Sequence, residues 1–425
     1  MDGVKKRMTT MRKWRLARLC IAGILCLHVL FVITLRERIA RGYPDFSVFY
    51  TAARILNQGL GHQLYVADVQ NRVQKEFTGN LPSRPAALPY IHPPFEALIF
   101  LPLSRLAYPP AFLIWNLLNI GILFSVALQL RPSIGLLRVI SPWQCVLVAA
   151  AFFPVFECLL QGQDSILQLL ACVLAWTALE KQEDFLAGCW FALGAFKFQL
   201  MLPIVLLVAI WRRSRVLLGF AAVSAALAAI SIGLVGWRGL LRYPAFALRV
   251  ADTPTLGGVP ADFLPNLHGL FLGWPLRLSG SIGIAAILSS SAALFLFFAI
   301  RGRLRGAPEQ SALRFSIAVA VSELIGWQTN IHDYTLLVLP ALLIADRCWH
   351  TPPQRTGGRW ALLYPLFPLL ISPVWFLLWL VTGNVNLIAI LLLWWLWKLS
   401  REIGAGPEAG VQPSLPVLAP GGSGA

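Results

Sequence analysis

The first residue placed to do chemistry is Asp45, in the stretch of residues 43–65. Apolar residues recur there at helical spacing with polar residues between them, which predicts an amphipathic helix. Because this stretch follows the first long apolar run, we expect the helix to lie on a membrane surface with its apolar face toward lipid. Asp45 stands at its first turn, where a carboxylate can meet both a lipid headgroup and a water-borne group. The structural alternative is a helix N-cap, in which the carboxylate accepts a backbone hydrogen bond.

Other polar groups stand between or inside later apolar runs. Residues 161–164 read QGQD, Lys197 interrupts the run 185–211, and residues 330–334 read NIHDY. Glu157 lies near the end of another apolar run, and an ionisable residue in such a place is a functional candidate by default. No H-E-x-x-H or C-x-x-C spacing occurs, so no metal ligands are predicted.

The elements that position these residues are membrane helices. Hydrophobic residues make up 57% of the chain and charged residues 13%, with a mean hydropathy of +0.69. Apolar runs near the length of about 20 residues that spans a bilayer recur almost to the C-terminus. Spanning segments satisfy their own backbone hydrogen bonds, so the expected fold is all-α.

The net charge of +16 does not indicate a nucleic-acid partner. The positive residues form short clusters between apolar runs, where cytoplasmic loops carry them. Membrane lipids are the predicted partners. We predict a basic cytoplasmic N-terminus (1–18), one transmembrane domain (19–400) and a disordered cytoplasmic tail (401–425). Long outer loops are expected at about 36–108 and 236–280, with about 12 spans in total.

Two arrangements remain open between residues 93 and 211. In one, residues 95–106 span the membrane and 185–211 form a single helix. In the other, 95–106 do not span, and 185–211 form a helical hairpin with Lys197 at its outer tip. We prefer the second because it keeps more basic residues inside and removes a lysine from the bilayer centre. Polar residues from separate parts of the chain then meet on the outer face, which indicates an active site there.

Several motifs, taken in order, carry a resemblance to a known family. They are D-x-x-V-x-Y-x-A-A (from Asp45), Y-x-H-P-P-F (from Tyr90), G-Q-D (162–164), A-G-x-x-x-A-L-G-A-x-K (187–197), N-L-H-G-L (266–270) and H-D-Y (332–334). From about residue 40 to 345 the chain resembles the polytopic GT-C glycosyltransferases. It is most similar to family 87, which includes polyprenol-phosphate-mannose-dependent α-1,2-mannosyltransferases. The family's G-Q is more usually followed by Asn than by Asp164.

The resemblance implies a GT-C type helical bundle and an inverting enzyme. Its donor is a sugar, mannose by resemblance, on a polyprenyl phosphate, and its acceptor is a glycolipid or polysaccharide. A general base takes the proton of the acceptor hydroxyl, and donor groups stabilise the leaving phosphate. It needs no cofactor, and a divalent metal is possible but not implied. The expected location is a bacterial inner membrane with the site on its outer face.

By the same resemblance Asp45 is the base. The predicted ligands of the donor sugar-phosphate are, in order of preference, Lys197, His332, Arg249, Arg242, Tyr50 and His92. Lower-ranked site residues are Asp164, Gln163, Glu157 and Asp333. The main alternative function is a secondary transporter or flippase, which shares multiple spans and intramembrane charges but often shows two similar halves. No such internal repeat is apparent in this sequence.

Overall fold

The computed structural model describes residues 2–81, 87–211, 213–252, 259–305, 310–350, 360–370, 375, 381 and 383–403. Within these ranges the regular elements are helices and no β-strand occurs, which confirms the predicted all-α class. Nearly all of the predicted disordered tail, and part of the predicted span 360–381, lie outside the described residues.

Within the described residues, four helices are long and apolar enough to cross a bilayer by length and composition. They lie in α1 (Asp2–Ala40), α5 (Tyr108–Leu130), α11 (Arg215–Asp252) and α13 (Gly280–Arg305). In the most apolar stretch of each helix, only 6 to 33% of the residues are buried. Most of their apolar side chains therefore face outward, as contact with lipid requires. The predicted number of about 12 spans stays a prediction.

Two bent helix pairs raise the number of candidate spans to six. The first, α6 (Pro142–Ala151) with α7 (Phe153–Gln161), bends by 85°. The second, α9 (Asp184–Leu193) with the segment Ala195–Ile210, bends by 71°. The preferred hairpin of 185–211 is therefore replaced by one bent pair. Lys197 lies buried at the bend instead of at an exposed tip.

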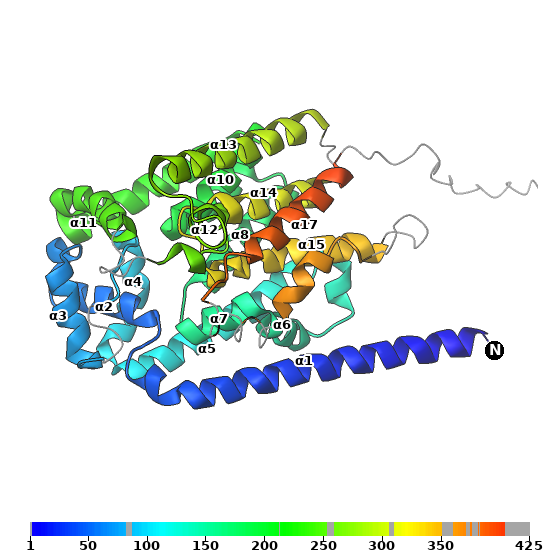
Figure 1. The fold of residues 1–425 in the computed structure, drawn as a ribbon, viewed down its shortest axis with the longest axis horizontal. Helices are drawn as coiled ribbons and strands as arrows, with labels where there is room; N and C mark the ends of the chain where they lie inside the picture. The colour runs from blue at the N-terminus through cyan, green and yellow to red at the C-terminus, as the bar shows by residue number, and fades with distance from the viewer. Residues whose placement is uncertain are drawn as a thin grey trace, which may run out of the picture.

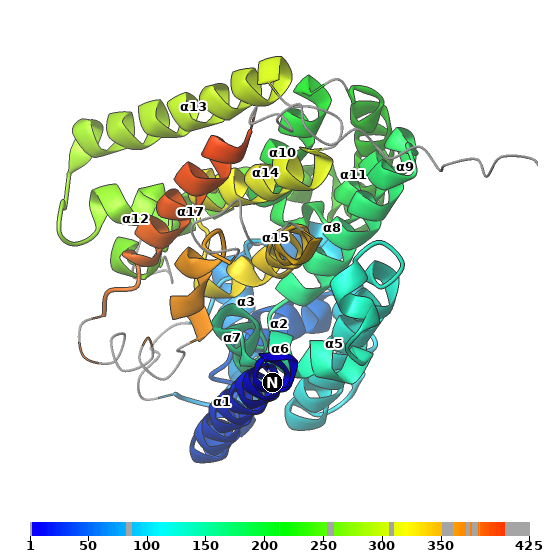
Figure 2. The same cartoon turned by 90° about the vertical axis from the view of Figure 1, so that its right-hand side faces the viewer.

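The centre of the bundle is α14 (Ser311–Ile325). It packs against α10 (Phe198–Ile210), α15 (Val338–His350) and α17 (Ile388–Glu402), as Figures 1 and 2 show. All its residues from 315 to 324 are buried, which is expected of a helix enclosed on every side. In contrast, α1 lies along the outside and is seen end-on in Figure 2.

The predicted first outer loop folds as a second core instead of a membrane-surface layer. It contains α2 (Phe46–Asn57), α3 (Ala67–Thr78) and the short α4 (Ala97–Phe100), gathered at one end of the molecule in Figure 1. Nine of the twelve residues of α2 are buried, so its apolar face packs against protein and the predicted contact with lipid is wrong. Residues 95–106 form only short turns around α4, too short to span.

Two buried glutamines of α3 attach the next segment to this core. Gln74 Oε1 accepts a hydrogen bond from the Leu88 amide at 2.9 Å, and Gln70 Oε1 accepts one from the Tyr90 amide at 2.8 Å. These bonds hold the extended backbone that leads to His92. Side-chain amides therefore satisfy the backbone N–H groups of Leu88 and Tyr90, just before the H-P-P motif.

Residues 237–252, expected in an outer loop, are instead helical. They continue α11 after a kink at Gly236, whose φ of 72° suits glycine. Arg242 and Arg249 lie on this helix with exposed side chains.

Candidate active site

A cavity of about 180 Å³ opens where α7, the start of α2 and the 3₁₀ helix η9 (Ile331–Leu337) meet. Four of its lining residues are polar and four are apolar. The lining residues are Asp45, Phe153, Glu157, Phe263, Asn330, Ile331, His332 and Val385. The cavity thus combines carboxylates, an imidazole and an amide with an apolar wall, and no Lys or Arg is among the described residues that line it.

Asp45 is half-buried and does not cap α2 with its side chain. Its Oδ2 instead accepts a hydrogen bond from Gln163 Nε2 at 2.9 Å. Its backbone amide donates to Gln161 Oε1 at 3.3 Å, and Gln161 Nε2 donates to Glu157 Oε1 at 3.1 Å. Two glutamines therefore hold Asp45 at the cavity, one by its backbone and one by its carboxylate.

The tight turn after α7 makes this arrangement possible. Gly162 has a φ of +62°, and a Cβ there would lie 2.8 Å from both Phe46 Cβ and Phe112 Cε2. Its carbonyl accepts a hydrogen bond from Trp115 Nε1 at 2.9 Å. Glycine is thus required both by conformation and by the close approach of α2. The turn points Gln161 and Gln163 toward Asp45.

Behind Gln163 lies a buried cluster of charges centred on Lys197. Its Nζ lies 2.6 Å from Asp164 Oδ1 and 2.6 Å from Asp333 Oδ1, and it donates to Ser165 Oγ at 2.8 Å. Burial alone would raise the pKa of both aspartates, but the Lys197 ammonium outweighs it and holds each pKa below its usual value. Both carboxylates are therefore charged at neutral pH.

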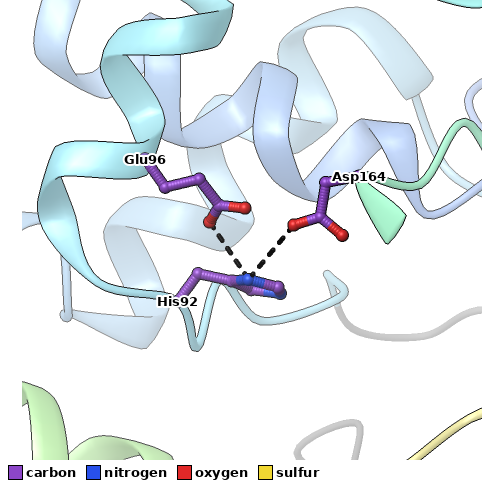
Figure 3. Close-up of side chains that lie close together, drawn as sticks. All are labelled: His92, Glu96 and Asp164. Atoms are coloured by element: carbon purple, nitrogen blue, oxygen red, sulfur yellow. Dashed lines mark ion pairs between the residues drawn. The ribbon is translucent and has the colours of Figure 1, made fainter. Parts of the chain in front are cut away.

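His92 and Glu96 lie beside Asp164 and extend the cluster (Figure 3). His92 Nδ1 lies 3.0 Å from Glu96 Oε2 and 3.8 Å from Asp164 Oδ2. Burial lowers the pKa of His92 to about 4, so its ring is neutral at pH 7. Burial, with the neighbouring Asp164 charge, raises the pKa of Glu96 well above its usual value. The raised pKa favours the protonated form of Glu96, which can donate a hydrogen bond to Asp164.

These three side chains also form a group that can hold a metal ion. One ligand atom from each of His92, Glu96 and Asp164 lies within 4.8 Å of the others. Nitrogen with two carboxylates is a donor set that transition metals accept. The Lys197 ammonium already pairs with Asp164, however, and a proton on Glu96 removes a further negative charge. Lys197 thus neutralises one of the two charged aspartates, and the cluster keeps one net negative charge.

A change at Glu96 should alter how stability depends on pH. An acid whose pKa is raised in the folded state keeps its proton there while the unfolded chain loses it, so stability falls as pH rises above about 4.3, by up to about 1.4 kcal/mol per pH unit. We expect Glu96→Gln, which keeps a hydrogen-bond donor, to melt at a higher temperature than wild type at pH 8, with a smaller difference at pH 5. Thermal unfolding of the detergent-purified proteins measures this.

The matched control is Glu76→Gln on α3, since Glu76 is a more exposed carboxylate paired with Arg54. Its melting temperature should follow that of wild type across pH. Parallel pH curves for wild type and Glu96→Gln would show instead that Glu96 is ionised in the folded protein.

The structure brings some of the predicted site residues together and leaves others apart. Asp45, His332 and Glu157 line the cavity, whereas Gln163 holds Asp45 from outside the lining. Lys197, Asp164, Asp333 and His92 form the buried cluster. Tyr50 is packed in the second core, with its hydroxyl donating to Leu106 O at 2.6 Å, and the exposed Arg242 and Arg249 are not among the residues that line the cavity.

Sequence reasoning missed Glu96, Gln161 and Asn330. The signal for Glu96 was available: it is the only acid in the run 95–106 and follows His92 by four residues, a spacing that brings side chains together in a turn of helix. Gln161 and Asn330 carried no comparable signal, because their roles depend on the turn geometry around them.

Among the described residues, the helices of spanning length and the buried charge cluster beside the cavity indicate a membrane protein. The chain belongs to glycosyltransferase family 87, whose model matches residues 90–325, more than half of its length. It is therefore a glycosyltransferase, which favours transfer chemistry over the transporter alternative. No curated protein and no solved structure matches the chain.

The matched region contains the buried cluster except for Asp333, and it contains Gln163 and Glu157. It begins after Asp45 and ends before His332. The roles of those two residues therefore depend on their position in the cavity.

Proposed function

We propose that the protein is an inverting glycosyltransferase that moves a sugar, mannose in the first instance, from a polyprenyl-phosphate donor to a glycolipid or polysaccharide acceptor. The reaction takes place at the outer face of a bacterial inner membrane. The observation that carries the proposal is the cavity that Asp45 and His332 line together with four apolar side chains. Family membership supports the reaction class.

The polar half of the cavity suits displacement at the anomeric carbon. The acceptor hydroxyl oxygen forms a bond to that carbon while Asp45 takes its proton. The bond from the carbon to the phosphate oxygen breaks, and polyprenyl phosphate leaves with the electron pair. His332 and the side-chain amide of Asn330 line the cavity and can donate hydrogen bonds to the phosphate oxygens. The proton on Asp45 then passes to water.

The apolar half of the cavity suits the lipid of the donor. Phe153, Phe263, Ile331 and Val385 form a wall that water solvates poorly. The isoprene unit nearest the phosphate can lie against this wall with the rest of the chain in the bilayer. A nucleotide-sugar donor offers no such apolar group and is not available outside the membrane. The cavity therefore favours a lipid-linked donor.

The functional test compares glycolipids and surface glycans by mass spectrometry in three strains: a deletion, the deletion restored with wild type, and the deletion restored with an expressed Asp45→Asn protein. We expect a sugar that is missing from the deletion to return only with wild type. An unchanged profile together with no transfer by purified enzyme would reject the proposal.

The purified enzyme is then given polyprenyl-phosphate mannose, with guanosine diphosphate mannose as the control donor, each with and without a metal chelator. We expect transfer only from the lipid donor, inversion at the anomeric carbon, and the same rate with chelator, because Lys197 already pairs with Asp164, one of the three groups that could hold a metal. Loss of activity with chelator, restored by a divalent cation, would show that a metal is required.

A further inference from the structure

We propose that Lys197 is a positioning residue and not, as predicted, a ligand of the donor phosphate. Its ion pairs link the turn after α7, which holds Asp45, to η9, which carries His332. We call this link the tie. The proposal rests on the proposed function of the cavity. It concerns how Asp45 and His332, which lie on separate segments, are held facing one space.

The surroundings of Lys197 leave no donor free for a substrate. A lysine ammonium has three N–H groups, and Asp164, Asp333 and Ser165 lie at 2.6, 2.6 and 2.8 Å from Nζ. The residue is 3% exposed and is absent from the cavity lining. Binding a phosphate would require Lys197 to give up a buried carboxylate, which is costly in a site closed to water.

The first link connects Lys197 to Asp45 through Asp164 and Gln163. Asp164 follows Gln163 directly in the turn after α7, and Gln163 Nε2 donates to Asp45 Oδ2 at 2.9 Å. The ion pair of Asp164 with Lys197 fixes the end of this turn. The Gln163 amide, and with it the Asp45 carboxylate, is therefore held in place by Lys197 through two residues.

The second link connects Lys197 to His332. Asp333 lies in η9, directly after His332, and its Oδ2 accepts a hydrogen bond from the backbone N–H of Asn330 at 2.8 Å. Ser165 Oγ also donates to Asp333 Oδ1 at 3.0 Å, which links η9 to the start of α8 (Ser165–Glu180). The turn that presents Asn330 and His332 to the cavity thus depends on the same ammonium.

The two roles for Lys197 differ in what should repair its loss. Lys197→Met leaves Asp164 and Asp333 as buried carboxylates without a counter-charge, and these should move apart or take up protons. If the ammonium serves only to tie them, neutralising both carboxylates removes the need for it. If the ammonium binds donor phosphate, neutralising them returns no cation to the phosphate.

A mutant cycle measures this difference. We expect Lys197→Met to lower kcat at least about 100-fold, with a small change in donor KM, because the reactive groups lose their alignment. In the Asp164→Asn/Asp333→Asn background the same substitution should cost about 10-fold or less. The matched control, Lys181→Met, removes an exposed lysine at the end of α8 and should leave kcat unchanged in both backgrounds.

Every outcome of the cycle decides the question. An equal cost of Lys197→Met in both backgrounds, or a rise in donor KM alone, would overturn the tie and restore the phosphate role. If Lys197→Met fails to fold, the double asparagine background should restore folding, and failure to do so also overturns it. If wild type proves to have no transferase activity, the proposed function fails, while melting temperatures of the same variants still test the tie.

Discussion

Replacing Asp45 with asparagine is expected to lower kcat by about 10²–10⁴-fold, the range that loss of a general base gives, while the protein folds normally. Asparagine has nearly the same shape, and its side-chain oxygen can still accept the hydrogen bond from Gln163 Nε2. What it lacks is the ability to take a proton from the acceptor hydroxyl. The effect should therefore appear in kcat, with donor KM changed little.

The measurement is a steady-state assay with purified enzyme, and the matched control is Glu157→Gln. Glu157 is a half-buried carboxylate lining the same cavity, hydrogen-bonded to Gln161. We expect it to change kcat less than about 10-fold, since its partner already uses one of its oxygens. The reverse result, with Glu157→Gln inactive and Asp45→Asn active, would assign the base to Glu157.

The sequence located Asp45 correctly at the start of a helix, but it could not show what the carboxylate contacts. Helical periodicity marks α2 and its first turn, because apolar spacing depends only on the local chain. The bond from Gln163 joins residues 118 positions apart and requires the left-handed turn at Gly162. The same limit explains the wrong prediction for α2: an apolar face has the same pattern whether lipid or protein covers it.

Lys197 shows a second limit of sequence reasoning. A single lysine in an apolar run was expected at an outer tip because an unpaired charge in the bilayer is costly. That argument holds only without partners. Two partners are supplied by Asp164 and Asp333, which are 33 and 136 positions away, and the bend between α9 and α10 brings the ammonium to them. The sequence shows all three charged residues, but it does not show that the fold brings them into contact.

Replacing His332 with alanine is expected to lower kcat/KM by about 10²–10³-fold, the loss that removal of one transition-state hydrogen-bond donor produces. His332 lines the same cavity as Asp45, and no lysine or arginine is among the described residues that line it. The leaving phosphate therefore depends on neutral donors. His332→Gln, whose amide can still donate, should recover at least about 10-fold of the loss, whereas a residue with a purely structural role would not be rescued in this way.

The pH profile tests which form of His332 acts. Burial lowers the pKa of His332, and Lys197 acts in the same direction, while Asp333 and Asp45 oppose them. A lowered pKa means that the imidazole is neutral from below its usual value near 6.5 upward. The wild-type rate should therefore stay level from pH 7 to 8, because no proton leaves His332 in that range. A rate that falls there in wild type but not in His332→Gln would show that the imidazolium is the active form, and that the leaving phosphate is stabilised by a positive charge instead of by a neutral N–H.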